Sequence, residues 1–516
     1  MQCKERQIVT YSHKSSINIF TIVVILLILA SILLRSFFFI EYSTFMNDDP
    51  MYYGVSQHII ASQIISHDGI SPHTLFPPGY PILISIQSLL FDTFRDIKFF
   101  QFVFIGITFS IIASIAGYQA FGNKYIFIIT LLHPAFILSA STLGISSENW
   151  YSVFIWSGII LCFSYIKNNK TTLLFYANLL FCFSYLIRPE ALAFLGSSFA
   201  AFIYNYQKIT EIPKRNSFKE LTIWIINGSR YLISNKVIFT FILPILLFVL
   251  PYMLYIYINT GYISISGKSS YNAQIVQELF SSNTNRIFVN FLEILRNFIA
   301  PYFIGPVVTT GVIAFIYLVI KKEIRVTIFH VILFIPLIIT ILAMLRYLPW
   351  ARALYVFIPV LLFISLQALE FYLKNSKNNF KNWIFIFIVT SFIVTIYSSI
   401  YRGVLCNNPV MYDKIVEKII ESENGLSKEV FVLTRNPKIN MNNRLIKSCM
   451  FKDKNLCTES PDYIIASNSE HLSIRNQTEI EKKIIDLKSF LHNGTIYKSI
   501  ASINRCKNNK IVLFKK

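Results

Sequence analysis

The residues most capable of chemistry begin with two adjacent acids, Asp48 and Asp49, in the segment Asp48-Asp49-Pro50-Met51-Tyr52. They follow the first long apolar segment directly, so we expect them at the lipid–water boundary, where charge is costly and marks function. A carboxylate there can accept a proton from a hydroxyl group. One Asp would suffice to cap a helix that starts at Pro50. The pair therefore favours Asp48 or Asp49 as a general base, with Tyr52 in the substrate site.

A second set of charged residues lies between later apolar segments. Glu148 is either a second acid of the site or a helix-start residue that interacts with the helix dipole. Arg188 precedes Pro189-Glu190, a pattern typical of a helix start, and can also bind a phosphate. Lys268 is a further candidate cation for an anionic substrate.

Arg346, Tyr347 and Arg352 lie close together in the sequence. Arginine binds phosphate through two parallel hydrogen bonds, although arginines near a membrane also extend to its surface without such a role. We expect a phosphate site there, with Tyr347 contacting the substrate. His67, Asp68 and His73 could contact a divalent ion, but this spacing is weakly specific, so metal binding stays open.

Composition places these residues in a membrane protein. Of the 516 residues, 54% are hydrophobic and 14% charged, and the mean hydropathy is +0.53. Apolar runs of about 20 residues recur along most of the chain, which is typical of transmembrane helices. The net charge of +20 comes largely from Lys and Arg in short loops between these runs, as expected for cytoplasmic loops. No nucleic-acid motif is present, so nucleic acid is not an expected partner.

Apolar segments predict about eleven spans. The first, 17–40, is a retained helix with a cytoplasmic N-terminus, followed by an outer loop at 41–97. A short interfacial helix is expected at 50–65, and 82–91 is short for a span. If 82–91 does not cross, the basic loops all fall on the cytoplasmic side. The remaining spans are then expected at 98–121, 124–142, 149–167, 171–187, 190–207, 236–258, 302–320, 325–345, 353–373 and 382–402.

Residues 403–516 change in composition and predict a small α/β domain outside the membrane. Val430–Thr434, Tyr463–Ala466 and Ile511–Phe514 are expected strands. Cys406, Cys449, Cys457 and Cys506 all lie in this region, and an even number fits two disulfides in an oxidising compartment. Spacing alone does not determine their pairing.

The motifs together resemble one family. Asp48-Asp49-Pro50-Met51-Tyr52 resembles the motif of two acids and a later tyrosine that follows the first helix of GT-C glycosyltransferases. The resemblance is greatest to the branch of protein O-mannosyltransferases and lipid A aminoarabinose transferases. Pro77-Pro78-Gly79-Tyr80-Pro81 resembles that branch's Pro-Pro-x-Tyr-Pro element, although Phe76 replaces the basic residue often found before it. Ser147-Glu148, Arg188-Pro189-Glu190 and the Pro-containing segment from Arg346 also match.

The resemblance implies a GT-C-like, α-helical, polytopic domain at 1–402 and leaves 403–516 as the extracytoplasmic α/β domain. It implies an inverting transfer of a sugar from a polyprenyl- or dolichyl-phosphate donor to a hydroxyl of a lipid, polysaccharide or protein. Asp48 or Asp49 would be the base, Glu148 the second acid, and Tyr80 a substrate contact. No cofactor is certain, and a divalent metal ion is possible within the family. A bacterial inner or plasma membrane is the expected location.

Two other functions fit some of these features. A transporter or flippase of lipid-linked or anionic solutes would place polar or Gly/Pro-broken segments near the middle of the membrane. Here the candidate charges lie at the expected outer ends of the apolar segments instead. An envelope glycan polymerase or ligase would use a diphosphate-linked oligosaccharide donor.

Overall fold

The computed structural model describes most of the apolar part of the chain and portions of the C-terminal part. The described residues are 19–42, 49–66, 72–91, 93–122, 124–132, 147–209, 237–266, 285–299, 306–346, 351–375, 390, 393–394, 396–397, 418–423, 430–433, 446–449, 462–467, 498–505 and 509–515. Cys406, Cys457 and Cys506 lie outside them, so the predicted disulfides stay predictions.

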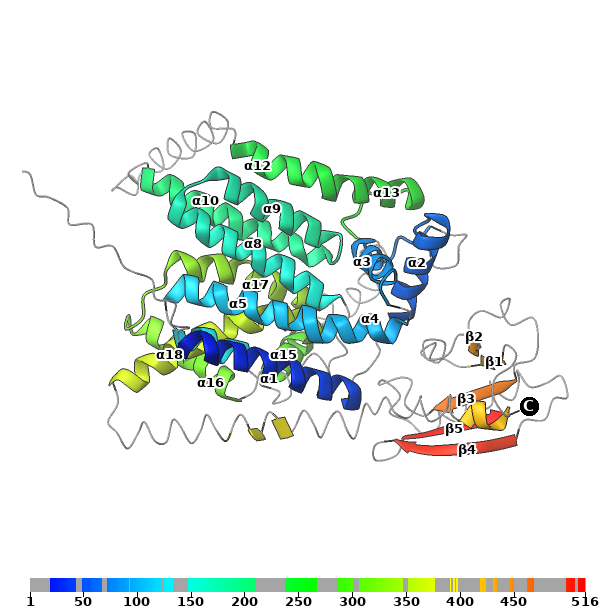
Figure 1. The fold of residues 1–516 in the computed structure, drawn as a ribbon. Coiled ribbons are helices and arrows are strands. Elements are labelled where there is room, and N and C mark those ends of the chain that lie inside the picture. The colour runs from blue at the N-terminus through cyan, green and yellow to red at the C-terminus, as the bar shows by residue number, and fades with distance from the viewer. Residues whose placement is uncertain are drawn as a thin grey trace, which may run out of the picture.

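Helices, most of them apolar, lie side by side in a bundle (Figure 1). Most of them coincide with apolar segments that the sequence predicts as spans. Their bounds are α1 Ile19–Tyr42, α5 Gly106–Phe121, α6 Lys124–Leu132, α8 Glu148–Asn168, α9 Thr171–Tyr185, α10 Leu195–Ile209, α12 Val237–Pro244, α13 Leu250–Thr260, α15 Asn285–Ile299, α16 Pro306–Ile320, α17 Ile328–Arg346 and α18 Ile358–Asn375.

Shorter helical segments extend several of these helices. α4 (Phe94–Phe100) continues through the π-helix η1 (Gln101–Ile105) into α5, and the π-helix η3 (Ile245–Val249) joins α12 to α13. The 3₁₀ segments η2 (Pro189–Phe194) and η4 (Ala351–Phe357) lead into α10 and α18. Pro189 stands at the start of η2 and Glu190 in its first turn, as the sequence predicts for a helix start.

Six helices in the described part of the chain are long and apolar enough to cross a membrane. They are Thr21–Phe39, Phe94–Phe121, Glu148–Asn168, Val237–Thr260, Ile328–Leu345 and Arg352–Asn375. Thr171–Tyr185 and Val308–Ile320 are shorter apolar helices. The chain is therefore a helical protein with several candidate membrane spans, and the total of about eleven stays a prediction.

Burial distinguishes central from peripheral helices. In the most apolar stretch of each helix, 72% of the residues are buried for Arg352–Asn375 but only 22% for Thr21–Phe39. α18 therefore lies among other helices, whereas α1 exposes large apolar side chains such as Leu33 that are suited to lipid. Between the central helices, the Trp156 indole N–H of α8 donates to the carbonyl of Val356 in η4 at 2.9 Å.

Two short helices cover one end of the bundle. α2 (Asp49–Ser62) and α3 (Gly79–Gln87) lie at the end where α4 and α13 also end (Figure 1). At 1.5 Å per residue, the nine residues of α3 are about 13 Å long, less than half of a hydrocarbon core. α3 cannot cross a membrane by itself. The predicted interfacial helix at 50–65 corresponds to α2.

Hydroxyl groups of α13 hold the connection between these two helices. The Tyr252 hydroxyl donates to the Thr74 carbonyl at 3.3 Å, and the Tyr255 hydroxyl donates to the Ile65 carbonyl at 3.3 Å. The backbone N–H of His73 donates to the same Ile65 carbonyl at 2.8 Å. The described ends of this connection, Ile65 and His73, are therefore fixed close to each other and to α13.

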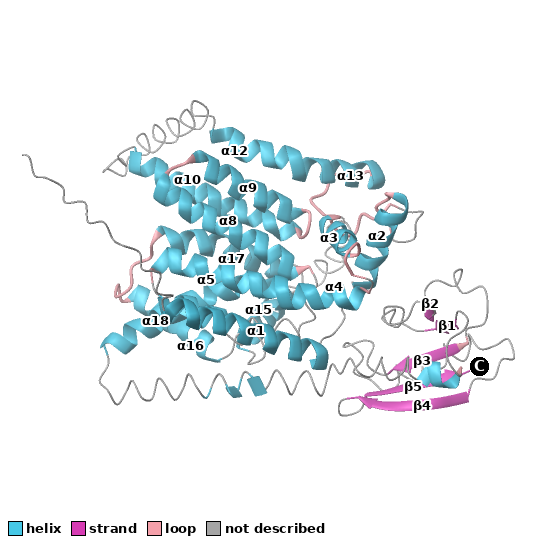
Figure 2. Cartoon of the chain, in the orientation of Figure 1, coloured by secondary structure: helices cyan, strands magenta, loops and turns pink. Residues whose placement is uncertain are grey.

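The described strands all belong to the C-terminal part of the chain (Figure 2). β1 (Val430–Leu433), β2 (Ile446–Cys449), β3 (Tyr463–Ser467), β4 (Lys498–Arg505) and β5 (Asn509–Lys515) form one sheet in the order β2-β1-β3-β5-β4. β1 pairs in parallel with β2 and β3, while β5 pairs antiparallel with β3 and β4. Whether 403–516 is a separate domain stays a prediction.

Candidate active site

Asp49 is the first residue of α2, and its side chain is fully buried. Oδ1 of Asp49 lies 3.5 Å from Nζ of Lys98, a buried lysine of α4. A buried carboxylate is costly unless it is paired with a cation or accepts hydrogen bonds. The pair therefore joins the segment after the first span to the start of the second. Asp48 lies outside the described residues.

Aromatic side chains pack beside Asp49. The rings of Tyr52 and Tyr80 meet edge to face with their centroids 4.8 Å apart, and the centroids of the Phe76 and Tyr52 rings are 4.9 Å apart. Tyr80 is fully buried in α3. Burial raises the pKa of the Tyr80 hydroxyl well above its usual value, and the nearby Asp49 and Glu148 carboxylates raise this pKa further. Tyr80 is therefore a neutral hydrogen-bond donor within electrostatic range of both acids.

The π-helix η1 positions a chain of hydrogen bonds behind Tyr80. The Tyr80 hydroxyl donates to Gln101 Oε1 at 2.7 Å, and Gln101 Nε2 donates to Gln87 Oε1 at 2.7 Å. A π-turn disturbs the regular helical bonding pattern and often lies at functional sites. Here the Gln101 carbonyl accepts a hydrogen bond from Nδ2 of Asn149 at 3.1 Å. η1 thus connects α3 to the start of α8.

The second acid, Glu148, begins α8 next to Asn149 and is buried. Its Oε1 pairs with Nη1 of Arg188 and lies 3.8 Å from Nε of Arg352. Arg188 also contacts Glu190 through Nη2 at 3.0 Å. Burial opposes the charge on Arg188, but the Glu190 and Glu148 carboxylates outweigh it and raise the pKa of the guanidinium. Two of the four predicted phosphate-binding residues therefore meet at one carboxylate.

A backbone contact holds the two halves of this region together. The N–H of Gly79 donates to the Leu186 carbonyl at 2.6 Å, two residues before Arg188. A Cβ on residue 79 would lie 2.5 Å from that carbonyl oxygen, so only glycine allows this approach. The Pro77-Pro78-Gly79-Tyr80-Pro81 element thereby fixes Tyr80 against the end of α9.

Arg35 of α1 lies behind the same region and was not predicted from the sequence. It is fully buried, and its Nη2 donates to Ser110 Oγ at 2.9 Å. The Tyr355 hydroxyl, which interacts with Arg35, donates to Asn149 Oδ1 at 3.1 Å. A buried arginine in an apolar helix indicates function or a structural network, and here it connects α1 and η4 to the residue after Glu148.

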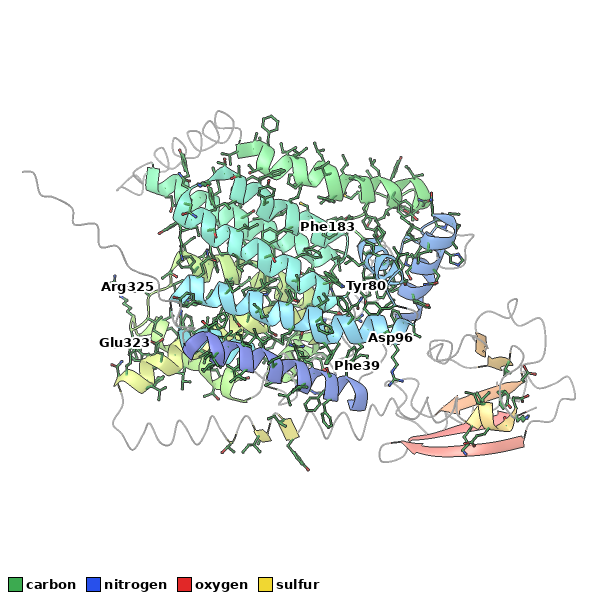
Figure 3. The ribbon with its side chains drawn as sticks, in the orientation of Figure 1. Phe39, Tyr80, Asp96, Phe183, Glu323 and Arg325 are labelled. Atoms are coloured by element: carbon green, nitrogen blue, oxygen red, sulfur yellow. The ribbon has the colours of Figure 1, made fainter. Side chains whose placement is uncertain are left out.

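The described residues place most of the predicted site together. Asp49, Tyr52, Tyr80, Glu148, Arg188 and Arg352 belong to one cluster, in which Tyr80 interacts with Asp49, Tyr52 and Glu148. In Figure 3 Tyr80 and Asp96 lie at one end of the bundle, and Glu323 and Arg325 at the other. Lys268 and Tyr347 lie outside the described residues, and Arg346 is placed only as the last residue of α17.

Sequence reasoning missed Lys98, Gln101 and Asn149. Lys98 carried a usable signal, because it is a lysine at the expected outer end of a span, against the cytoplasmic preference of basic residues. Gln101 and Asn149 have amide side chains, which are also common at exposed helix ends and therefore do not mark a site. Their roles depend on the π-turn and on the approach of α3 to α8, which no local pattern indicates.

This arrangement can accept a proton and bind an anion. Asp49 supplies a buried carboxylate, and Arg188 and Arg352 supply guanidinium groups suited to phosphate. Across the described ranges, no group of three or more His, Cys, Asp or Glu side chains is arranged to hold a metal ion. His73, which the sequence offers as a metal ligand with His67 and Asp68, stacks on Phe76 at 5.6 Å. His67 and Asp68 lie outside the described residues, so metal binding stays open.

No protein-family model and no curated protein sequence matches the chain. Among solved structures, the crystal structure of the oligosaccharyltransferase of Archaeoglobus fulgidus in its apo form is similar, with a TM-score of 0.44 and 13% sequence identity. The match covers 81% of this chain and 63% of the archaeal chain, so this chain spans less than two thirds of that protein. A likeness at this level carries no argument about activity.

Proposed function

We propose that this chain is an integral membrane glycosyltransferase that moves a sugar from a polyprenyl- or dolichyl-phosphate donor to a hydroxyl acceptor. One observation carries the proposal. Two buried carboxylates from separate segments, Asp49 and Glu148, gather with the guanidinium groups of Arg188 and Arg352 at one end of a bundle of apolar helices. A donor with its tail in the bilayer would present its anionic head group at such an end.

The chemistry is a single displacement at the anomeric carbon of the sugar. The acceptor hydroxyl attacks this carbon while Asp49 takes the hydroxyl proton. The bond from the anomeric carbon to the phosphate oxygen breaks, and its electron pair leaves with the lipid phosphate. One displacement inverts the configuration, by the same logic as in inverting glycosidases. The neighbouring Asp48 stays the alternative base.

The guanidinium groups would stabilise the charge on the departing phosphate. Each guanidinium has five N–H donors, more than one carboxylate oxygen can accept. Glu148 therefore orients Arg188 and Arg352 rather than using all their donors. Tyr52 and Tyr80 would contact the sugar, and Arg346, Lys268 and Tyr347 stay candidates for the same substrate. A divalent ion stays a possible additional group.

The proposal puts the reaction on the outer face of the membrane, with a cytoplasmic N-terminus and 403–516 outside. The acceptor is a lipid, an envelope polysaccharide or a protein. The cluster lies at the bundle end opposite Glu323 and Arg325, which belong to a basic loop predicted to be cytoplasmic (Figure 3). This geometry favours an enzyme with its site at the outer surface over a transporter with a site in mid-membrane.

Mass spectrometry of envelope glycans tests the proposal. A strain lacking the gene is complemented with the wild-type chain, Asp48→Asn, Asp49→Asn or Asp96→Asn at matched protein levels. Asp96 is the control because it is an exposed aspartate of α4, where it interacts with Thr93. We expect a glycan that is lost on deletion, restored by wild type and Asp96→Asn, and reduced at least about 100-fold by Asp49→Asn or Asp48→Asn. Full restoration by both of the latter variants would overturn the proposal.

A further inference from the structure

Lys98 lies on the buried face of α4, beside the candidate base. α4 begins after Thr93, whose hydroxyl oxygen accepts a hydrogen bond from the Asp96 N–H at 3.2 Å. Phe94 and Ile97 of the same helix are buried, whereas Arg95 and Asp96 are exposed. A lysine at a helix end normally extends its ammonium to water. Lys98 instead remains 4% exposed, on the side of α4 that faces α2.

The contact with Asp49 offsets the cost of this burial. Removing one charge of a buried pair leaves the other uncompensated, whereas replacing both by neutral groups is often tolerated. Nζ of Lys98 lies 3.5 Å from Oδ1 of a carboxylate that is itself fully buried. The pair therefore forms a close electrostatic unit between α2 and α4.

The other charged groups of the cluster belong to a different unit. Glu148 has its own cations, Arg188 and Arg352, and Glu190 shares Arg188. Phe76, which packs on Tyr52 beside Asp49, is buried and carries no charge. Among the described residues, Lys98 is the basic side chain that pairs with Asp49.

We infer that Lys98 is a positioning residue. Its ammonium group holds the Asp49 carboxylate in the orientation in which it takes the proton from the hydroxyl group of the sugar acceptor. This inference rests on the proposed function. Lys98 acts through Asp49, whereas the proposed function assigns the donor phosphate to Arg188 and Arg352. Its loss therefore slows transfer without weakening donor binding.

Four variants of the full chain test this role. Lys98→Met keeps most of the aliphatic stem and removes the charge, and Lys98→Arg keeps the charge. Lys167→Met is the matched control, because Lys167 lies in the last turn of α8, is exposed, and donates to the Gln119 carbonyl at 2.8 Å. Asp49→Asn/Lys98→Met removes both charges of the pair. Transfer is measured by the glycan assay in cells, and binding by titrating purified protein with decaprenyl phosphate.

We expect Lys98→Met to lower transfer by about 10- to 100-fold, with the decaprenyl phosphate Kd changed by less than about twofold. Lys98→Arg regains transfer, and Lys167→Met matches wild type. Unchanged transfer in Lys98→Met overturns the inference. A Kd that rises about 10-fold also overturns it, because Lys98 would then be a phosphate ligand.

Protein levels and thermal melting distinguish a folding defect from a loss of the Lys98 role. They also distinguish failure of the Lys98 role from failure of the proposed function. If Lys98→Met fails to accumulate, the double variant is expected to accumulate, because it leaves no unpaired buried charge. In that case the glycan transfer of Lys98→Arg tests the inference. If Lys98→Arg transfers as little sugar as Asp49→Asn does, the inference is overturned. If Asp48→Asn and Asp49→Asn both transfer like wild type, the proposed function fails. If the change in melting temperature of Asp49→Asn/Lys98→Met equals the sum of the changes in the two single variants, only the role of Lys98 is refuted.

Discussion

Glu148 shows how burial changes the value of an ion pair. Its side chain is 3% exposed and that of its partner Arg188 is 11% exposed. The pair of Glu293 and Arg296 on α15 is 40% and 71% exposed, so water screens it. Exposed pairs contribute about 0–1 kcal/mol, whereas breaking a buried pair costs about 3–5 kcal/mol.

We therefore expect Glu148→Gln to lower the free energy of unfolding by about 3 kcal/mol, since it leaves Arg188 with Glu190 alone. Thermal melting of the purified protein in detergent measures the effect. The matched control, Glu293→Gln, should shift the melting temperature only slightly. Equal shifts in the two variants would contradict the importance of the Glu148 pair.

The raised pKa of the Tyr80 hydroxyl leads us to expect that the stability of the fold falls at alkaline pH. This pKa is raised by burial, so the folded chain keeps the phenol proton to a higher pH than the unfolded chain does. The contribution of Tyr80 is complete below about pH 10 and is lost as pH rises above that value. Tyr80→Phe should remove up to about 1.4 kcal/mol per pH unit from this decline.

Melting temperatures between pH 8 and pH 11 test the Tyr80 prediction. Tyr262→Phe removes the same hydroxyl from an exposed position and is the matched control. Tyr80→Phe should flatten the alkaline decline more than this control does. Identical profiles for the two variants would show that the raised pKa of Tyr80 is wrong.

Individual residues were more predictable than their partners. Asp49, Glu148 and Arg188 stand out in the sequence because charge is rare near the apolar segments. Their contacts with Lys98, Arg352 and each other depend on how five separate segments meet. A single sequence does not show which of these segments contact each other. It supports only the expectation that they lie on the same side of the membrane.

At the scale of elements, apolar length predicted the helices but not their irregularities. The segment Gln101–Ile105 is apolar apart from its first residue and continues the pattern of the span, yet it forms a π-helix. Its conformation brings the Gln101 carbonyl to Asn149 and the Phe102 carbonyl to Arg35. These partners come from α8 and α1, so the π-helix takes part in tertiary contacts that no local sequence pattern indicates.

The approach of α3 to the end of α9 leads to a prediction for Gly79. A Cβ in Gly79→Ala would meet the Leu186 carbonyl oxygen at 2.5 Å and its carbon at 2.7 Å, and neither backbone atom can rotate away. We expect α3 to shift, Tyr80 to separate from Gln101, and glycan transfer to fall by about 10-fold or more. The glycan assay measures the loss.

Gly122→Asn is the control for Gly79→Ala. Gly122 ends α5 with φ of +69° and has open space around it, and asparagine tolerates this conformation. Its transfer should remain close to that of wild type. If Gly79→Ala retained full transfer, the contact between α3 and α9 would not position the site.

At the scale of the whole molecule, the sequence predicted the helical class and the positions of most apolar helices. It also placed strands where β1, β3 and β5 lie. The order β2-β1-β3-β5-β4 was not predictable, because strand pairing depends on contacts between distant segments. The fold likewise brings α2, α3, η2 and η4 to the starts of α4 and α8, and that arrangement generates the candidate site.

The bundle has two ends, and the proposed function requires that the end with Tyr80 faces outward. Asp96 lies at that end and Arg325 at the other (Figure 3), and both side chains are exposed. We expect a membrane-impermeant maleimide added to intact cells to label Asp96→Cys and not Arg325→Cys. Permeabilised cells should label both, which controls for accessibility. Peptide mass spectrometry reads each position separately from the seven native cysteines. The reverse pattern would place the carboxylates in the cytoplasm and exclude an extracytoplasmic transfer.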